Sequence, residues 1–544
     1  MSNPQYSGIR NTTLLLLIAS IVLTSPVHGT SPDSDIIESS CITTSYPDIC
    51  YSTLSTTKNL ATKKDVIQHT INKTKEIIRG NFNTIKKLTA TDNLNKRCEI
   101  ALHDCIEMIA GTLEDLDMVI RELNAYPTKK SLRQHANDLI TLMSTTITNK
   151  ETCLDDVSYD EVCKQLCNSI IQGQDLGGKM CSNVLAMIKN MTYTDMANKQ
   201  EFDVQNFEDE MWPEWLSTRD RKLFGLFGVT PNVTVAKDGK GNYTTVAAAV
   251  EAAPQKSKRR YLIKIAEGVY EEYVEVPKSK KNLMFIGDGR EKTIITGNKS
   301  VVGSGSTTWT SATVAAMGDG FLARDITFQN TAGPSGHQAV ALRVGSDLSA
   351  FYRCSMLGYQ DTLYVTTGRQ FYVNCMVVGT VDFIFGNAAV VFQFCDILAQ
   401  RPNRRQRNMV TAQGRTDANQ NTGIVIQKSK IGATSELQEV QANFSTYLGR
   451  PWKKYSRTVV MGSIISDVIK PEGWYRWKGD FALDTLYYRE YQNVGPGADT
   501  SKRVNWTGWG VMKNKIEAIP FTVGSFINGW RWLPRTGFPF WPVW

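Results

Sequence analysis

Apolar residues recur with two different periods along this 544-residue chain. Between about residues 35 and 195 they return every three or four positions, as in residues 65–78 and 98–109, and charged residues fill the positions between them. This spacing gathers the apolar side chains on one face of a helix. Short polar segments separate the helical stretches, so residues 31–195 predict an all-α four-helix bundle.

From about residue 230 onward the apolar residues come in short β-type runs separated by Gly, Asn and Asp, such as residues 261–265. Three similar runs each contain a cysteine, at Cys354, Cys375 and Cys395, so the runs repeat every 20 or 21 residues. A repeat of about 20 residues built from short strands is typical of a solenoid. Residues 229–544 therefore predict an all-β right-handed parallel β-helix, with an antiparallel sandwich as the alternative.

The segments outside these two regions carry processing signals. Arg10 precedes an apolar run of about ten residues, which is too short to span a bilayer and is typical of a signal peptide, placed at residues 1–30. An uncleaved signal anchor is the alternative. Residues 196–228 turn acidic, then aromatic, then basic, as a linker does, and include a dibasic candidate processing site within residues 221–224. The chain is therefore expected to be secreted and, given its Asn-X-Ser/Thr sequons, glycosylated.

The positions of the cysteines and the net charge limit which classes of function the chain can have. Eight of the eleven cysteines lie before residue 182, which in an oxidising compartment predicts disulfide bonds that stabilise the helical region. The Cys and His residues lack the paired spacing of a zinc site, so no metal is expected. A formal net charge of +8 is too weak to indicate nucleic acid binding but suits an anionic polymer.

Two aspartates occupy equivalent places in the β-type repeat. Asp361 and Asp382 each follow a repeat cysteine by seven residues, so adjacent turns of the solenoid would hold them roughly 5 Å apart. Two like charges that close disfavour joint ionisation, which leaves one carboxyl protonated as an acid and the other anionic as a base or nucleophile. The alternative is a polar ladder on a solvated face of the solenoid.

The polar residues near this pair favour catalysis. Gln338 and Gln360 can donate hydrogen bonds to a developing oxyanion without adding charge. Arg450 can form a bidentate bond to an aspartate and hold it ionised, and Trp452 lies two residues further on.

Three segments, residues 358–364, 379–388 and 448–452, resemble the signature segments of pectin methylesterases, and the similarity runs from about residue 230 to 540. The helical half resembles the pectin methylesterase inhibitor domain, in residues 41–50, 101–105 and 152–155. Together they resemble a plant pectinesterase with an inhibitor-like pro-region. The resemblance implies a secreted, monomeric enzyme of the cell wall, the apoplast, that hydrolyses the C6 methyl esters of homogalacturonan to pectate and methanol without a cofactor. It also implies processing within residues 221–224.

The resemblance further implies roles for single residues. Asp382 would attack the methyl-ester carbonyl, and Asp361 would protonate the departing methanol and then activate water. Gln338 and Gln360 would hold the oxyanion. Arg450 would orient Asp382. The substrate-binding residues that the resemblance implies are Thr308, Gln338, Arg450 and Trp452.

The resemblance also implies three disulfide bonds. The implied pairs are Cys41–Cys50, Cys105–Cys153 and Cys375–Cys395, which leave Cys354 as a buried thiol and the pairing of Cys98, Cys163, Cys167 and Cys181 open.

Other functions remain as alternatives. A serine esterase would need a G-x-S-x-G turn, which the sequence lacks. A β-helical glycosidase or lyase would also use paired carboxylates, but it would shorten the polymer. A third alternative is a catalytically idle protein that binds the wall or inhibits esterases. A fourth is a bifunctional chain, in which the helical domain is released by cleavage and inhibits other esterases as an intermolecular inhibitor. We expect the helical half to restrain the enzyme, with pectin as the main partner and neither nucleic acid nor, after processing, membrane.

Overall fold

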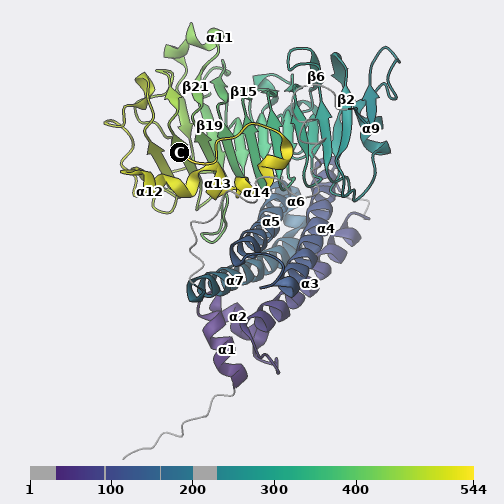
Figure 1. The fold of residues 1–544 in the computed structure, drawn as a ribbon, viewed down its shortest axis with the longest axis vertical. Coiled ribbons are helices and arrows are strands. Elements are labelled where there is room, and N and C mark those ends of the chain that lie inside the picture. The colour runs from purple at the N-terminus through teal and green to yellow at the C-terminus, as the bar shows by residue number, and fades with distance from the viewer. Residues whose placement is uncertain (1–31, 91–93, 160, 200–229) are drawn as a thin grey trace, which may run out of the picture.

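The computed structural model describes residues 32–90, 94–159, 161–199 and 230–544, which form a helical bundle packed against one side of a β-helix (Figure 1). The predicted signal peptide, residues 1–30, and the dibasic site within residues 221–224 lie outside the described residues.

The helical half consists of four long helices with shorter ones at its ends. Two of the long helices begin where the sequence supplies a capping box: the side chains of Thr62 and Asp65 close the start of one, and those of Ser131 and Gln134 the start of another. The predicted bundle is confirmed. Its helices are α1 (Pro32–Cys41), α2 (Pro47–Leu54), α3 (Lys63–Leu88), α4 (Lys96–Ala125), α5 (Leu132–Ser158), α6 (Glu161–Leu166) and α7 (Asn168–Asn198).

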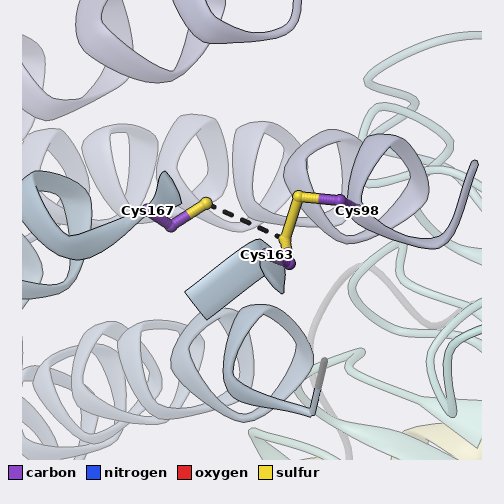
Figure 2. Close-up of side chains that lie close together, drawn as sticks. All are labelled: Cys98, Cys163 and Cys167. Carbon is purple, nitrogen blue, oxygen red and sulfur yellow. Dashed lines mark hydrogen bonds between the residues drawn. A yellow bond between two sulfur atoms is a disulfide. The ribbon is translucent and has the colours of Figure 1, made fainter. Parts of the chain in front are cut away.

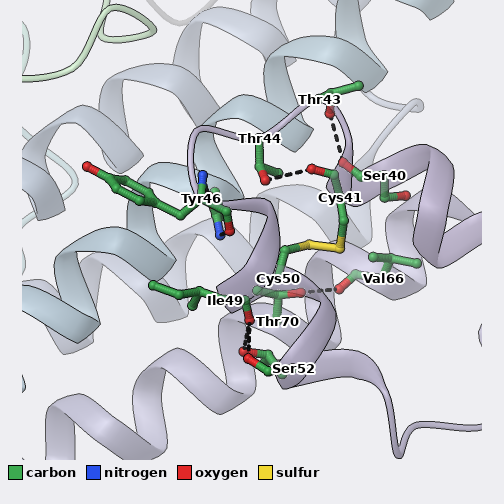
Figure 3. The surroundings of a disulfide bond; sticks show 12 residues. Ser40, Cys41, Thr43, Thr44, Tyr46, Ile49, Cys50, Ser52, Val66 and Thr70 are labelled. Atoms are coloured by element: carbon green, nitrogen blue, oxygen red, sulfur yellow. Dashed lines mark hydrogen bonds between the residues drawn. A yellow bond between two sulfur atoms is a disulfide. The ribbon is translucent and has the colours of Figure 1, made fainter.

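Three disulfide bonds join helices of the bundle. Cys41–Cys50 links α1 to α2 (Figure 3) and Cys105–Cys153 links α4 to α5, which are the two expected pairs in this half. The third, Cys98–Cys163, resolves part of the open pairing by joining α4 to α6. Cys167 and Cys181 are buried free thiols, and the sulfur of Cys167 lies 3.8 Å from that of Cys163 (Figure 2).

The second half is a parallel β-helix of three sheets, and every strand pair in the described residues is parallel, which excludes the sandwich. The 11-stranded sheet contains, in spatial order, β1 (Val233–Val235), β2 (Tyr261–Ile265), β5 (Leu283–Ile286), β8 (Leu322–Arg324), β11 (Ser349–Tyr352), β14 (Arg369–Val373), β17 (Ala389–Gln393), β20 (Gly423–Gln427), β23 (Arg457–Met461), β25 (Tyr487–Tyr491) and β26 (Trp509–Val511). The 8-stranded sheet contains β3 (Gly268–Glu271), β6 (Thr293–Gly297), β9 (Thr327–Asn330), β12 (Ser355–Leu357), β15 (Met376–Gly379), β18 (Asp396–Ala399), β21 (Lys430–Ala433) and β24 (Ile464–Ile465).

The third, 7-stranded sheet faces the bundle. It contains β4 (Val274–Val276), β7 (Val314–Ala316), β10 (Leu342–Val344), β13 (Leu363–Val365), β16 (Ile384–Gly386), β19 (Asn408–Gln413) and β22 (Thr446–Gly449). The β-helical half also contains short helices between and after its strands. They are α9 (Val246–Ala252), α10 (Val301–Ser304), α11 (Ser435–Gln438), α12 (Lys515–Ala518), α13 (Val523–Phe526) and α14 (Gly529–Trp532).

Stacked side chains fill the interior of the solenoid. Phe351 and Tyr372 stack with ring centroids 4.6 Å apart, and Tyr372 stacks on the next coil's Phe392 at 4.7 Å. The repeat that the cysteines revealed is therefore a core repeat, in which identical positions on successive coils pack on one another.

The implied Cys375–Cys395 disulfide is wrong in this structure. Both residues are buried free thiols, as Cys354 is, and each donates to carbonyl oxygens of its own and a neighbouring coil. The core position that repeats every coil holds the thiols one above another, and the parallel ladder fixes their backbones without a covalent bond.

Candidate active site

Asp361 and Asp382 lie side by side at the edge of the sheet that faces the bundle. The backbone N–H of Asp361 donates to the carbonyl of Val381 at 3.0 Å, and β13 and β16 continue the same register from Leu363 and Ile384. Both aspartates have left-handed backbones, with φ of 63° and 52°. Asp tolerates this conformation better than most residues, although it costs energy, so the turn holds both carboxyls in a defined direction.

Arg450 holds the second carboxylate. Its Nε donates to one oxygen of Asp382 at 2.8 Å and its Nη2 to the other at 2.6 Å, a bidentate pair that favours the ionised carboxylate. Arg450 follows β22 directly, and its guanidinium lies 4.3 Å from the ring centroid of Trp477. Trp477 was not among the site residues that the sequence predicted.

The first carboxyl has a different environment. Burial raises the pKa of Asp361 well above its ordinary value, the charge of Asp382 raises it further, and Arg450 opposes both effects. Only 7% of Asp361 and 6% of Asp382 are exposed. Burial therefore gives Asp361 a raised pKa beside a carboxyl that Arg450 holds through two hydrogen bonds, so the two like residues have different environments.

The two glutamines occupy adjacent coils beside the pair. The N–H of Ala339, next to Gln338, donates to the carbonyl of Gln360, so the two amide-bearing residues stack along the solenoid. Among the described residues, the side chains of Gln338 and Gln360 have no hydrogen-bond partner, and the buried Oε1 of Gln338 is left unpaired. Both amides are therefore available to a ligand at the aspartates.

Aromatic side chains continue the site along the sheet. Tyr364 and Phe385 stack at 4.2 Å, Trp309 meets Tyr364 edge-on at 6.3 Å, and Trp452 lies 5.9 Å from Phe385. We call these four residues the aromatic face. Thr308, the remaining predicted substrate contact, is half-buried in the loop before β7. Its neighbours Thr307 and Trp309 both form hydrogen bonds to side chains of the bundle.

The helical bundle covers the aromatic face. Trp309 Nε1 donates to Glu107 of α4 at 3.1 Å, and the hydroxyls of Tyr364 and Thr152 of α5 lie 3.5 Å apart. Trp309, Tyr364 and Phe385 are at most 4% exposed and belong to the same buried cluster as the bundle core. The bundle therefore occupies the surface next to the two aspartates.

Opposite charges line this contact, with the acidic side chains on the bundle. Asp155 accepts from Lys453 at 2.6 Å and Asp115 from Lys278 at 2.5 Å. Asp138 accepts from Arg369 at 2.9 Å. The bundle presents carboxylates to a cationic surface, as an anionic polymer would.

Burial raises the pKa values of several acidic side chains of the bundle. It raises the pKa of Asp104, on α4, to about 7, although Thr307 and Arg343 oppose the change. Burial also raises the pKa of Asp115 to about 6, against the attraction of Lys278, and raises that of Asp156. Burial is the largest cause of each of these pKa shifts.

The described residues contain one cluster of metal-binding side chains, the sulfurs of Cys98, Cys163 and Cys167, which lie within 4.8 Å of one another. The first two form a disulfide (Figure 2), so the cluster offers one thiol rather than three thiolates, and burial raises the pKa of that thiol to about 11. It lies in the bundle, away from the aspartates. Among the described helices, none is long and apolar enough to cross a membrane.

Known proteins match both halves of the chain. The pectinesterase family model matches residues 232–530, and the plant invertase/pectin methylesterase inhibitor model matches residues 35–187. Pectinesterase 3 of Citrus sinensis is 58% identical over 522 residues, covering 94% of this chain and 89% of the relative. Pectinesterase/pectinesterase inhibitor 3 of Arabidopsis thaliana is 56% identical over 538 residues, covering 94% and 91%.

A solved structure matches the β-helical half. Pectin methylesterase from carrot is 67% identical with a TM-score of 0.58, and the match covers 59% of this chain and 100% of the carrot chain. That share corresponds to the length of the β-helical half, and the match leaves no part of the carrot chain over.

Proposed function

This chain belongs to the pectinesterase family and carries an inhibitor-type domain ahead of its esterase domain, and from this premise we infer how its residues hydrolyse the methyl esters of pectin. The observation that carries the inference is the geometry around Asp382: a carboxylate held by both nitrogens of Arg450, beside a second carboxyl of raised pKa.

In the first half of the reaction, one oxygen of Asp382 attacks the ester carbonyl carbon of a galacturonate unit. The carbonyl oxygen becomes an oxyanion, which the free amides of Gln338 and Gln360 stabilise. When the intermediate collapses, the C–O bond to the methoxy group breaks and Asp361 gives its proton to the departing methanol. An acyl anhydride on Asp382 and an ionised Asp361 remain.

In the second half, Asp361 takes a proton from water as that water attacks the acyl carbon. The bond to Asp382 breaks, the galacturonate leaves as a free carboxylic acid, and both aspartates return to their starting states. Asp361 can act first as acid and then as base because burial holds its pKa well above the ordinary value.

An idle wall-binding protein is the competing proposal. Such a protein has no use for free amides beside an arginine-held carboxylate, and a carbohydrate-binding role would be served by the aromatic face alone. A polymer-cleaving enzyme is disfavoured by the family.

We assign the helical domain, within residues 31–195, an autoinhibitory role because α4 and α5 cover the aromatic face. Cutting within residues 221–224 would permit the two halves to separate, and residues 229–544 would then act on pectin as a monomer. The acidic residues of the bundle suit an intramolecular inhibitor of an enzyme for an anionic polymer. Entry into the secretory pathway through residues 1–30 would deliver the enzyme to the cell wall.

Exchanging Arg450 for lysine is expected to lower kcat about 100-fold in residues 230–544. Lysine keeps the charge but cannot donate two parallel hydrogen bonds, so Asp382 loses its fixed direction. Methanol release from highly methylated pectin measures the effect, with the exposed Arg401→Lys as the matched control. Activity within twofold of the unaltered protein would refute the orienting role.

Raising the pH is expected to release the bundle from the full chain. Asp104 and Asp115 have raised pKa values, about 7 and about 6, while the halves are in contact, and values near ~4 when exposed. Their contribution to the contact is therefore complete below about pH 4 and is lost as the pH rises through about 6 to 7.

The measurement is methanol release by the full chain divided by that of residues 230–544, from pH 4 to 8. This ratio is expected to rise about tenfold or more. Asp104→Asn, which keeps an acceptor for Thr307 but cannot ionise, should flatten the rise. A ratio that stays constant or falls with pH would contradict the assignment.

A further inference from the structure

Successive coils of the β-helix pass from the 11-stranded sheet to the 8-stranded sheet through a turn whose first residue has a left-handed backbone. Arg353 follows β11 and its N–H donates to the carbonyl of Val373 at 3.2 Å, while Asn374 follows β14 and donates to that of Gln393 at 3.2 Å. The 7-stranded sheet, with the candidate active site, does not border this corner. We call these residues, with φ between 48° and 61°, the turn ladder: Asp325, Arg353, Asn374, Phe394, Lys428, Gly462 and Gln492.

The turn ladder forms a row of residues along this corner of the solenoid. Parallel pairing places equivalent residues of successive coils about 4.8 Å apart. Glycine and asparagine adopt a left-handed backbone readily, whereas arginine, phenylalanine and lysine adopt it at a cost in energy. Arg353, Phe394 and Lys428 accept that cost in turns that less strained residues could form, which points to a use for their side chains.

An open groove of about 370 Å³ lies along the first four residues of the turn ladder. Two arginines share one carboxylate there: Arg353 donates to both oxygens of Asp325, at 2.7 and 2.9 Å, and Arg324 donates to one of them at 2.9 Å. The shared carboxylate leaves a positive charge over. The residues that line the groove are Arg290, Asp325, Arg353, Asn374, Phe394 and Asp396.

Three polar side chains of the groove are available to a ligand. Among the residues that the structure describes, the side chains of Arg290, Asn374 and Asp396 form no hydrogen bond or ion pair within the protein. They are a guanidinium, which donates, an amide, which donates and accepts, and a carboxylate, which accepts.

The end of the chain adds an exposed indole ring beside the groove. After α14 the chain runs back across the strands of the solenoid (Figure 1). The side-chain amide of Gln393 bonds both the N–H and the carbonyl of Trp541, each at 2.9 Å, and so fixes the backbone there. The Trp541 ring meets that of Phe394 edge-on at 4.6 Å and is 47% exposed.

The last residue places a second indole on the same row, two coils further along. Trp544 lies over Gly462, where a Cβ would overlap its ring, so the turn ladder lacks a side chain at the one place that the ring fills. Its Nε1 donates to Gln492 at 3.2 Å, and Nζ of Lys428 lies 5.7 Å from its ring centroid. Cations and indole rings therefore lie together along one corner of the molecule.

We propose that the turn ladder and the two tail tryptophans form a second binding site, for de-esterified pectin, on a part of the β-helix away from the two aspartates. A galacturonate unit has a carboxylate, hydroxyls and an apolar ring face. The guanidiniums of Arg290 and Arg353 suit the carboxylate, Asn374 and Asp396 suit the hydroxyls, and Trp541 suits the ring face. A methyl ester carries no charge, so the site prefers the product of the reaction. This inference rests on the proposed function for the identity of the polymer.

The second site is open while the helical half is in place. Among the described residues, no hydrogen bond or ion pair joins the turn ladder to the bundle, and no bundle residue lines the groove. The uncut chain can therefore bind de-esterified pectin while α4 and α5 cover the aromatic face.

The test measures binding of the uncut full chain to fully de-esterified polygalacturonate by isothermal titration calorimetry, with highly methylated pectin and the neutral glucan dextran as comparison polymers. One variant combines Arg353→Gln with Lys428→Gln, and two others are Trp541→Ala and Trp541→Phe. The matched control combines Lys258→Gln with Arg259→Gln, two exposed cations in the loop before β2.

The unaltered chain is expected to bind polygalacturonate at least about tenfold more tightly than either comparison polymer, and more weakly as the ionic strength rises. The double charge variant and Trp541→Ala should each raise the Kd for polygalacturonate about tenfold, because each removes a main contact of the site. Trp541→Phe, which keeps an aromatic ring, should stay within about threefold, and the control should not change the Kd.

No binding by the unaltered chain, equal affinity for dextran, or a Kd that both the double charge variant and Trp541→Ala leave unchanged would overturn the inference. If Trp541→Ala lowers the unfolding temperature, the double charge variant, which leaves the tail intact, decides the question. Methanol release by residues 230–544 tests the proposed function separately, so absence of methanol would overturn the esterase and leave the binding result standing.

Discussion

Asp382→Asn is expected to reduce methanol release from highly methylated pectin at least ~1,000-fold in residues 230–544, because removal of a catalytic nucleophile commonly costs that much or more. Asparagine is the most informative replacement for Asp382. It resembles aspartate in size, tolerates the left-handed backbone at this position and can still accept one hydrogen bond from Arg450, while it cannot attack the ester.

The matched control is Asp480→Asn, at a side chain that is 90% exposed and pairs only with Arg476 at the surface. It should leave activity unchanged. Equal thermal unfolding temperatures of the unaltered protein, Asp382→Asn and Asp480→Asn would show that the loss of activity comes from the missing nucleophile and not from a destabilised fold. If Asp382→Asn kept more than a tenth of the activity, the nucleophile would have to be sought elsewhere, with Asp361→Asn as the next variant.

Separation of the helical half is expected to raise the methanol release of the protein at least ~100-fold. In the full chain the bundle is tethered to the face it covers, so its effective concentration is in the millimolar range and it stays in place even if its intrinsic affinity is modest. Residues 230–544 have no such cover over Trp309, Tyr364 and Phe385.

A charge reversal in the uncut chain tests whether the contact itself inhibits. Asp155→Lys places a cation against Lys453, which lies 2.6 Å from Asp155, and a repulsive pair at this half-buried contact favours separation. It should recover at least a tenth of the activity of residues 230–544. The same change at the exposed Asp35 should recover none. If the full chain released methanol as fast as residues 230–544, the helical half would not be autoinhibitory.

The proximity of the two aspartates could be predicted from the sequence because a solenoid converts spacing into geometry. Asp361 and Asp382 follow Cys354 and Cys375 at equal intervals, and a parallel ladder places equal intervals side by side. The capping boxes at Thr62 and Ser131 likewise fix the starts of two helices through neighbours in the chain. The role of Arg450 beside Asp382 needed the family resemblance, since 68 residues separate the two.

The disulfide pattern shows where such reasoning fails. Cys375 and Cys395 are one coil apart, yet the structure has them as thiols that face backbone carbonyls. Cys98 and Cys163 do pair, although 65 residues separate them, because α4 and α6 pack with their backbones 5.3 Å apart at that point. Adjacency in a repeat brings two cysteines near, but a disulfide bond also requires a specific geometry of the two side chains.

By itself the sequence determined the two fold types, the repeat and the residues that lie together within one coil or its neighbour, because each of these depends on periods and on short stretches of chain. The tertiary structure alone decided that α4 and α5 cover the aromatic face, that Asp104 lies buried against Thr307, and that Asp115 lies buried against Lys278. These features join residues 160 to 240 positions apart, roughly, and depend on which surfaces match in shape and charge. No period in the sequence encodes that match.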